Sequence, residues 1–189
     1  MIYLALHHIA FELNQSLRRH SLSGEDIVVL ANPVEADGKS DGIATNKVIL
    51  FLAGLERDTL PMRSGGDNQM LSYQAPTWLN VYLMVAANFT ARSYPDSLKY
   101  LSRVIAFFQA HPVFDRHSSP AMDEKIDKLI LDMENLDRRE LSNLWGMFGG
   151  KYMPSVLYRV RMLGIDASSV AGRRHAVSEP AVSSHAKEN

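Results

Sequence analysis

Hydrophobic residues return every three or four positions along the first part of the chain. The aliphatic residues with this spacing are Ile2, Leu6, Ile9, Leu13 and Leu17. Steps of three and four place side chains on one face of a helix. We therefore predict an amphipathic helix that begins near Ile2 and ends near His20, with its apolar face turned toward a core.

Two more helices are predicted further along the chain. One follows Pro95, because proline suits the first turn of a helix. Its apolar stripe is formed by Leu98, Leu101, Ile105 and Phe108. The other begins at Asp137, since Asp137 and Glu140 have the spacing of a capping box, and it ends at Gly149-Gly150.

Between the helices, runs of β-branched and aromatic residues predict five strands. They span residues 27–31, 48–55, 79–89, 129–133 and 156–165. In the last strand Arg159 and Arg161 alternate with Tyr158 and Val160. The two arginines are therefore expected on one face of the sheet and the apolar residues on the other.

This order of elements predicts the α+β class. The strands occur in groups rather than in strict alternation with helices, which favours a mixed or antiparallel sheet packed on one face by helices. The pattern extends over residues 1–166, which we interpret as one domain. Residues 167–189 are rich in Ala, Ser and His without apolar periodicity, and we predict a disordered tail there.

Composition excludes several classes of function. The 189 residues include 20 Lys and Arg, 21 Asp and Glu and no cysteine, for a formal net charge of -1. This balance argues against a polybasic protein that binds nucleic acid by counterion release, and the lack of cysteine excludes disulfides and thiolate metal sites. His7 and His8 interrupt the apolar start of the chain. We therefore expect no cleaved signal. The uncharged stretch at 68–91 is interrupted by Gln and Asn residues, so we expect no membrane helix there either, and folding in the cytoplasm.

The ionisable residues offer few arrangements suited to catalysis. His8 and Glu12 share a helix face, but the helix of a zinc protease needs two histidines at that spacing. Asp123 or Asp127 together with His117 would form an acid–base pair if the fold brought them together, which leaves a small enzyme as one alternative. The main expectation is a protein without catalysis, cofactor or metal ion.

Residues 135–166 combine side chains that are typical of protein interfaces. Tyr, Trp and Arg are enriched where proteins anchor one another, and accessible sheet edges can accept a strand from a partner. Trp145 is open to two interpretations, because it suits a core position as well as an interface. The candidate interface residues are Trp145, Lys151, Tyr152, Pro154, Ser155, Tyr158, Arg159 and Arg161.

Blocks of residues along the chain, including this region, carry a family resemblance. The blocks are LNVYL at 79–83, SLKYLS at 97–102, VIAFFQ at 104–109, ELSNLWG at 140–146 and KYMPSVLY at 151–158. In this order and spacing they resemble the tail-terminator, or tube-cap, family of contractile injection systems, the phage-tail-like particles of bacteria. The likeness runs from Met1 to about Asp166.

The resemblance implies an α+β fold and a structural role. It implies a hexameric ring at the baseplate-distal end of the particle, where the ring stops growth of the inner tube and anchors the last sheath ring. The implied partners are further copies of the chain, the tube protein and the sheath protein, without nucleic acid, cofactor or membrane insertion. Assembly is expected in the cytoplasm, with release of the particle from the cell left open. A transient adaptor or assembly factor of the same particle is the alternative.

Overall fold

The computed structural model describes residues 1–19, 25–33, 44–58, 77–149 and 151–165. In chain order the elements are α1 (Ile2–Arg18), β1 (Val28–Leu30), β2 (Lys47–Arg57), β3 (Thr77–Asn88), the short 3-10 helix η2 (Ala91–Ser93), α2 (Tyr94–Ala110), β4 (Val113–Asp115), β5 (Lys128–Glu134), α3 (Arg138–Met147) and β6 (Ser155–Ile165). The three predicted helices and five predicted strands are all present. The sequence pattern does not predict β4, because three residues are too few to show alternation.

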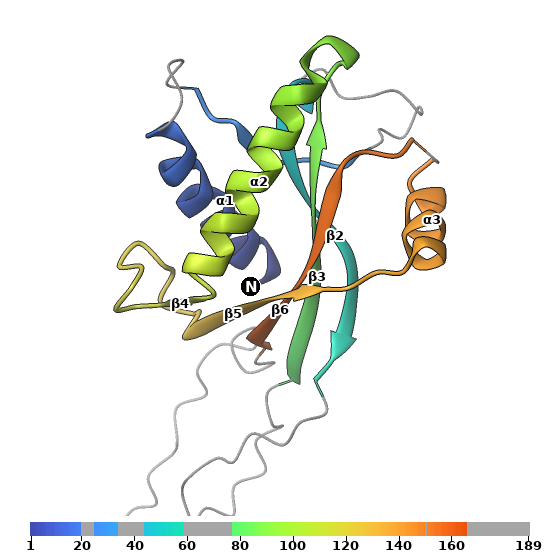
Figure 1. Ribbon diagram of the computed structural model, residues 1–189. Helices are drawn as coiled ribbons and strands as arrows, with labels where there is room; N and C mark the ends of the chain where they lie inside the picture. The colour runs from blue at the N-terminus through green and yellow to red at the C-terminus, as the bar shows by residue number, and fades with distance from the viewer. Residues whose placement is uncertain (20–24, 34–43, 59–76, 150, 166–189) are drawn as a thin grey trace, which may run out of the picture.

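The six strands form one mixed sheet in the order β1-β2-β3-β6-β5-β4 (Figure 1). Strand β1 runs parallel to β2, and the other neighbouring strands are antiparallel. The last of the described strands, β6, lies in the middle of the sheet between β3 and β5. The predicted α+β class and mixed sheet are therefore confirmed.

Helices α1 and α2 pack on one face of this sheet (Figure 1). The main core lies between them and the strands, and Ile9, Leu13 and Leu83 are fully buried in it. Burying an aliphatic side chain of this size stabilises the fold by about 1.5–3 kcal/mol. This layer accounts for the predicted apolar face of the first helix.

The buried face of α2 is rotated slightly about the helix axis from the predicted apolar face. Ser97, Val104 and Phe108 are its buried residues, whereas Leu98 is exposed. Ser97 tolerates burial because its hydroxyl donates a hydrogen bond of 2.6 Å to the carbonyl of Tyr94. Ser97, whose hydroxyl bonds within its own helix, is therefore buried where the apolar pattern predicts Leu98 to be buried.

Helix α3 lies on the opposite face of the sheet, which corrects the expectation that all helices share one face. A second, smaller core forms there and includes Phe51, Met84 and Trp145. The predicted capping box is confirmed: the Asp137 carboxylate accepts hydrogen bonds of 2.7 and 2.8 Å from the amides of Arg139 and Glu140. The predicted tail at 167–189, and with it the boundary at residue 166, lies outside the described residues.

Candidate subunit and tube interface

The structure places Trp145 in the smaller core. Its ring lies 6.2 Å from that of Phe51, and its indole Nε1 donates a hydrogen bond of 3.2 Å to the Ser155 hydroxyl. Only 2% of its surface is exposed. Of the two interpretations left open by the sequence, the core position is the one that the structure shows. Trp145 and Ser155 together fix α3 to the start of β6.

Tyr158 is a core residue and not a surface residue, which corrects its place among the interface candidates. It is 2% exposed, and its ring packs edge-on against Phe108 at 4.8 Å. Its hydroxyl has no hydrogen-bond partner among the described residues. Burial raises the pKa of Tyr158 to about 12, because the phenolate would be stripped of water there.

Arg159 and Arg161 point to the opposite face from Tyr158, as the alternation predicts. Arg159 Nε lies 2.8 Å from Glu134 Oε1, and Arg161 Nη2 lies 2.5 Å from Asp132 Oδ2. Strands β5 and β6 are neighbours, so both pairs cross between them. Each of these four side chains is about one-third exposed, and within each pair the charges balance.

The polar row continues onto β3 and β2. Tyr82 is the direct neighbour of Arg159 across β3 and β6, and its hydroxyl donates a hydrogen bond of 2.6 Å to Glu56. This bond raises the pKa of Tyr82, since it is lost when the phenol ionises. We call this row the polar strip. It consists of Glu56, Tyr82, Asp132, Glu134, Arg159 and Arg161.

The remaining candidates form the connection between α3 and β6. Lys151 and Tyr152 are exposed, whereas Pro154 and Ser155 are partly buried. The Tyr152 ring lies 6.0 Å from the Trp145 ring, and the carbonyl of Pro154 accepts a hydrogen bond of 2.9 Å from the Ala87 amide. Lys151 and Tyr152 are therefore the accessible part of this segment.

A groove of about 380 Å³ opens between α3 and Tyr152. It is lined by Arg138, Leu141, Ser142, Trp145, Gly146 and Tyr152. Met147, at the end of α3, is 73% exposed. We call the groove together with Met147 the α3 surface. Sequence reasoning missed Arg138, Gly146 and Met147, because nothing in the local pattern shows which side of α3 faces away from the sheet.

A second groove, of about 370 Å³, lies between α1 and β1. Tyr3, His7 and Phe11 follow one another at four-residue steps on its helical side, and all three are exposed. The rings of Tyr3 and His7 are 5.5 Å apart. We call these three residues the α1 surface. The apolar periodicity of α1 predicts its buried stripe and does not predict this exposed row.

The edge of the sheet at β1 is closed by a side chain. In a parallel pair of strands, the main-chain groups of an edge strand point alternately toward its neighbour and away from it. Here Ile27 and Ala31 bond to β2, whereas the amide and carbonyl of Val28 point outward. The outward amide and carbonyl of Val28 are both taken by the side-chain amide of Asn14, at 2.8 Å each. An added strand would have to displace Asn14.

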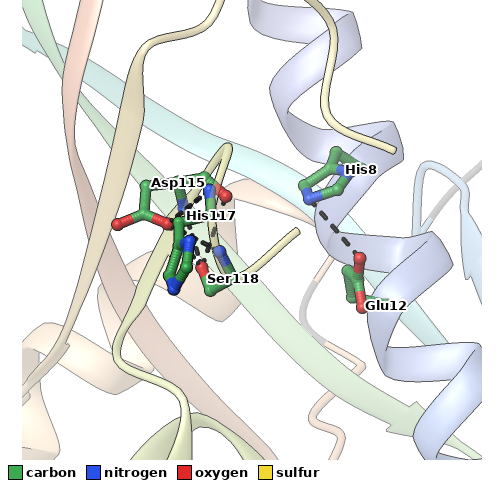
Figure 2. A network of polar contacts seen from close by, with 5 residues as sticks. All are labelled: His8, Glu12, Asp115, His117 and Ser118. Carbon is green, nitrogen blue, oxygen red and sulfur yellow. Dashed lines mark hydrogen bonds and ion pairs between the residues drawn. The ribbon is translucent and has the colours of Figure 1, made fainter. Parts of the chain in front are cut away.

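The opposite edge, at β4, is closed in the same way at Asp115. Its amide donates a hydrogen bond of 3.1 Å to the Ser118 hydroxyl, and its carbonyl accepts one of 2.8 Å from the Ser119 amide. The Asp115 carboxylate in turn accepts bonds from the main chain of His117 and Ser118 (Figure 2), and those from Ser118 lower its pKa most. The expectation of accessible edges is therefore wrong at Val28 and Asp115.

The residues considered for acid–base chemistry do not come together. His117 contacts Asp115 through its main chain, and the Asp123 carboxylate accepts a bond of 2.9 Å from the Lys125 amide. Within the described ranges, no hydrogen bond or ion pair joins His117 to Asp123 or Asp127. The same part of the chain holds no cluster of three His, Asp or Glu residues suited to a metal ion.

His8 is buried and lies 3.7 Å from Glu12 (Figure 2), the pair that shares a face of α1. Its ring packs edge-on against Phe114 at 5.9 Å. Burial lowers the pKa of His8, against the opposing effect of Glu12. The pair therefore serves to pack α1 against β4.

Among the described helices, none is long and apolar enough to span a membrane.

Comparisons with known proteins give one family match and two structures of similar fold. The family described as Pvc16 N-terminal domain matches residues 6–179. The fold is similar to the sheath/tube terminator of the PVC extracellular contractile injection system in its extended state, with a TM-score of 0.50 and 16% identity over 95% of this chain. It is equally similar to the tube-terminating cap of the anti-feeding prophage, with a TM-score of 0.50 and 18% identity over 91% of this chain.

The chain spans 63% of the length of the first of these structures and 58% of the second. A search of curated proteins gave no match.

Proposed function

Because the chain belongs to the Pvc16 N-terminal domain family, we propose that it is a structural cap of a contractile injection particle. In this role it forms a hexameric ring at the baseplate-distal end, terminates the inner tube and anchors the last sheath ring. The observation that carries the proposal is the family match over residues 6–179, supported by a fold shared with two tube-terminating proteins. The role requires binding surfaces and no catalysis.

The surface chemistry suits such a role. Each edge of the sheet is closed at one residue, Val28 on β1 and Asp115 on β4, which favours contacts between copies and partners through side chains. The formal net charge of -1 lets several copies gather around one axis without strong repulsion. Ring contacts of this kind are head to tail, and they use two different surfaces of each copy.

The polar strip is our candidate for the contact with the tube or sheath. Arg159 and Arg161 are held by Glu134 and Asp132, so their guanidinium groups are already oriented. A docked protein would meet fixed hydrogen-bonding groups and would not have to order them, which lowers the entropic cost of binding. Lys151 and Tyr152 extend the same candidate contact toward α3.

Electron microscopy of particles from cells with and without the gene tests this function. Loss of the protein should give tubes of uncontrolled length, or sheaths that contract without a trigger, and the purified wild-type particles should carry the protein at the end away from the baseplate. Particles of normal length and stability without the gene would contradict the cap.

The alternative is a transient adaptor or assembly factor of the same particle. It would be needed during assembly but would be absent from the finished end, so labelled protein in purified particles separates the two roles. We propose assembly in the cytoplasm for either role, as the setting in which tube ends first form.

A further inference from the structure

The two arginines of the polar strip are held in different ways. Arg159 faces Glu134 with its buried Nε, at 2.8 Å, and no hydrogen bond or ion pair among the described residues uses its two terminal nitrogens. Arg161 differs, because its terminal Nη2 is the atom that contacts Asp132. The Arg159 side chain is 36% exposed, so another molecule can reach it. Arg159 is thus oriented by one acidic neighbour and keeps a free donor edge.

The free edge of a guanidinium is suited to a carboxylate. Its N–H groups form a planar fork that matches the two oxygens of a carboxylate, and such bidentate pairs are stronger than neutral hydrogen bonds. Glu134 holds the Arg159 fork in place, so a bound carboxylate does not have to order it. The chemistry of this group therefore favours an acidic side chain of another molecule.

A single carboxylate lies on the other side of Tyr82. Glu56 is exposed and accepts the hydrogen bond of the Tyr82 hydroxyl through Oε2, and within the described part of the chain no cation pairs with it. Glu56 and Arg159 belong to β2 and β6, the two strands that flank β3, and two strand spacings amount to about 10 Å. The face of the sheet thus presents one free negative group and one free donor edge on either side of a tyrosine.

The charges of the strip favour one kind of partner. Asp132 and Glu134 are each matched by an arginine, which keeps them from repelling an incoming carboxylate, whereas Glu56 is left with a negative charge. A partner with an acidic side chain opposite Arg159 and a basic one opposite Glu56 complements both groups. The reverse arrangement would place like charges together, so the strip also specifies the orientation of the partner.

The strip is open to a partner because α3 packs further along the same face. Helix α3 covers Phe51, Met84 and Leu157 in the smaller core. Met84 pairs with Leu157 across β3 and β6, and Tyr82 pairs with Arg159 two residues away on the same face. In Figure 1 the end of β2, the start of β3 and the end of β6 extend beyond α3.

On the basis of the proposed cap, we propose that Arg159 binds a carboxylate of the inner-tube protein through its two terminal nitrogens, while Glu56 binds a basic side chain of the same tube subunit. The occupant of the polar strip is thus the tube and not the sheath, because stopping the growth of the tube requires direct contact with its last subunits. Arg161 keeps Asp132 neutralised beside this contact.

Zero-length cross-linking in intact particles tests the contact. Arg159→Lys replaces the guanidinium by an amine that a carbodiimide couples to a carboxylate touching it. Glu134→Gln in the same chain removes the acid that would compete for this amine. Mass spectrometry of particles that carry both substitutions should show an amide bond between position 159 and an Asp or Glu of the tube protein.

The matched control is Arg103→Lys, the same change at an exposed arginine of α2, in the helix layer on the other face of the sheet. Position 103 should give no bond to the tube. The proposal is overturned if position 159 couples only to the sheath, only to a copy of this chain, or to nothing.

Binding of the purified chain to purified tubes provides a second readout that does not require a finished particle. Arg159→Gln and Glu56→Gln should each weaken binding at least about tenfold, since each leaves a charged group of the tube without its partner. Arg103→Gln should leave the affinity unchanged, and thermal unfolding verifies that each variant folds. A folded Arg159→Gln variant that binds as tightly as the wild type, or a wild type that does not bind tubes, would overturn the proposal.

These results are distinguishable from failure of the proposed function. Particles that need the gene for normal length but show no bond between position 159 and the tube overturn the contact alone. Particles that are normal without the gene overturn the cap itself.

Discussion

The side-chain amide of Asn14 binds the main chain of Val28 through two hydrogen bonds of 2.8 Å, and so occupies the position of a further strand beside β1. The relationship joins the middle of α1 to an edge strand of only three residues. It satisfies two main-chain groups that would otherwise invite another chain to pair with the sheet.

Replacement of Asn14 should therefore destabilise the fold strongly. Asn14→Leu leaves a buried donor and a buried acceptor without partners, at about 1–3 kcal/mol each. Urea unfolding should show a loss of about 2–5 kcal/mol, and Gln15→Leu at the exposed neighbouring position should change stability by less than about 0.5 kcal/mol. A loss for Asn14→Leu no larger than for Gln15→Leu would contradict the assigned role.

His8 should make the fold sensitive to mild acid. Its pKa in the folded chain is below the ordinary value of 6.5, mainly because of burial, so the unfolded chain binds a proton more readily. Stability is full above 6.5 and falls as the pH drops below it toward the folded pKa. The urea midpoint should decrease from about pH 7 to about pH 5 in the wild type, and much less in His8→Leu. Equal slopes in the two proteins would exclude His8 as the cause.

Tyr158 should respond to substitution as a core residue. Tyr158→Phe removes a hydroxyl that has no partner in the described structure, so stability should stay equal or rise by up to about 1 kcal/mol. Tyr158→Ala should cost about 3–5 kcal/mol through the cavity that it leaves. Thermal unfolding measures both, and a marked loss in the phenylalanine variant would show that the hydroxyl has a bonding role.

The pairs of the polar strip should contribute little to stability. Arg161 and Asp132 are about one-third exposed, and a double-mutant cycle with alanine should give a coupling of about 0.2–1 kcal/mol that shrinks at high salt. If the strip binds the tube or sheath, Arg161→Ala should still fold but should leave particles uncapped. A stable variant that caps normally would remove Arg161 from the candidate contact.

The predicted capping box offers a further quantitative check. Asp137→Ala removes both hydrogen bonds to the first turn of α3 and should destabilise the chain by about 1 kcal/mol. Arg139→Ala changes an exposed side chain in the same turn and should cost less than about 0.5 kcal/mol in the same denaturation experiment. Similar values for both would mean that the cap adds nothing beyond helix propensity.

The features that could be predicted depend on residues that are close together in the sequence. The stripe of α1, the capping box at Asp137 and the alternation in β6 each depend on neighbours a few residues apart, and all three are confirmed. The resemblance to tail terminators is confirmed as well, by the family match. Two features could not be predicted from the local pattern. Strand β4 has three residues, too few to show alternation, and Ser97 is a polar residue that is buried because its hydroxyl donates a hydrogen bond to the Tyr94 carbonyl.

The interface was predicted in part for a related reason. Composition marks Tyr and Arg as suited to binding, but only the sheet decides that Tyr158 points into the core while Arg159 points out. The α3 surface depends on which side of a helix the sheet covers, and Gly146 gives no pattern at all. Whether the exposed candidates contact tube or sheath stays a prediction.

Because β6 lies in the middle of the sheet, the sheet can be completed only late in synthesis of the chain. Strands β1 to β3 and strands β4 to β5 are made first, and within the described sheet β6 (Ser155–Ile165) is the strand that joins the two groups. A ribosome therefore releases most of the polypeptide before β3 and β5 have their shared neighbour, and pairing across that distance is slow. Until the last strand inserts, two long open strands are exposed to aggregation. Translation that stops early would yield fragments for proteolysis and not a smaller version of the protein.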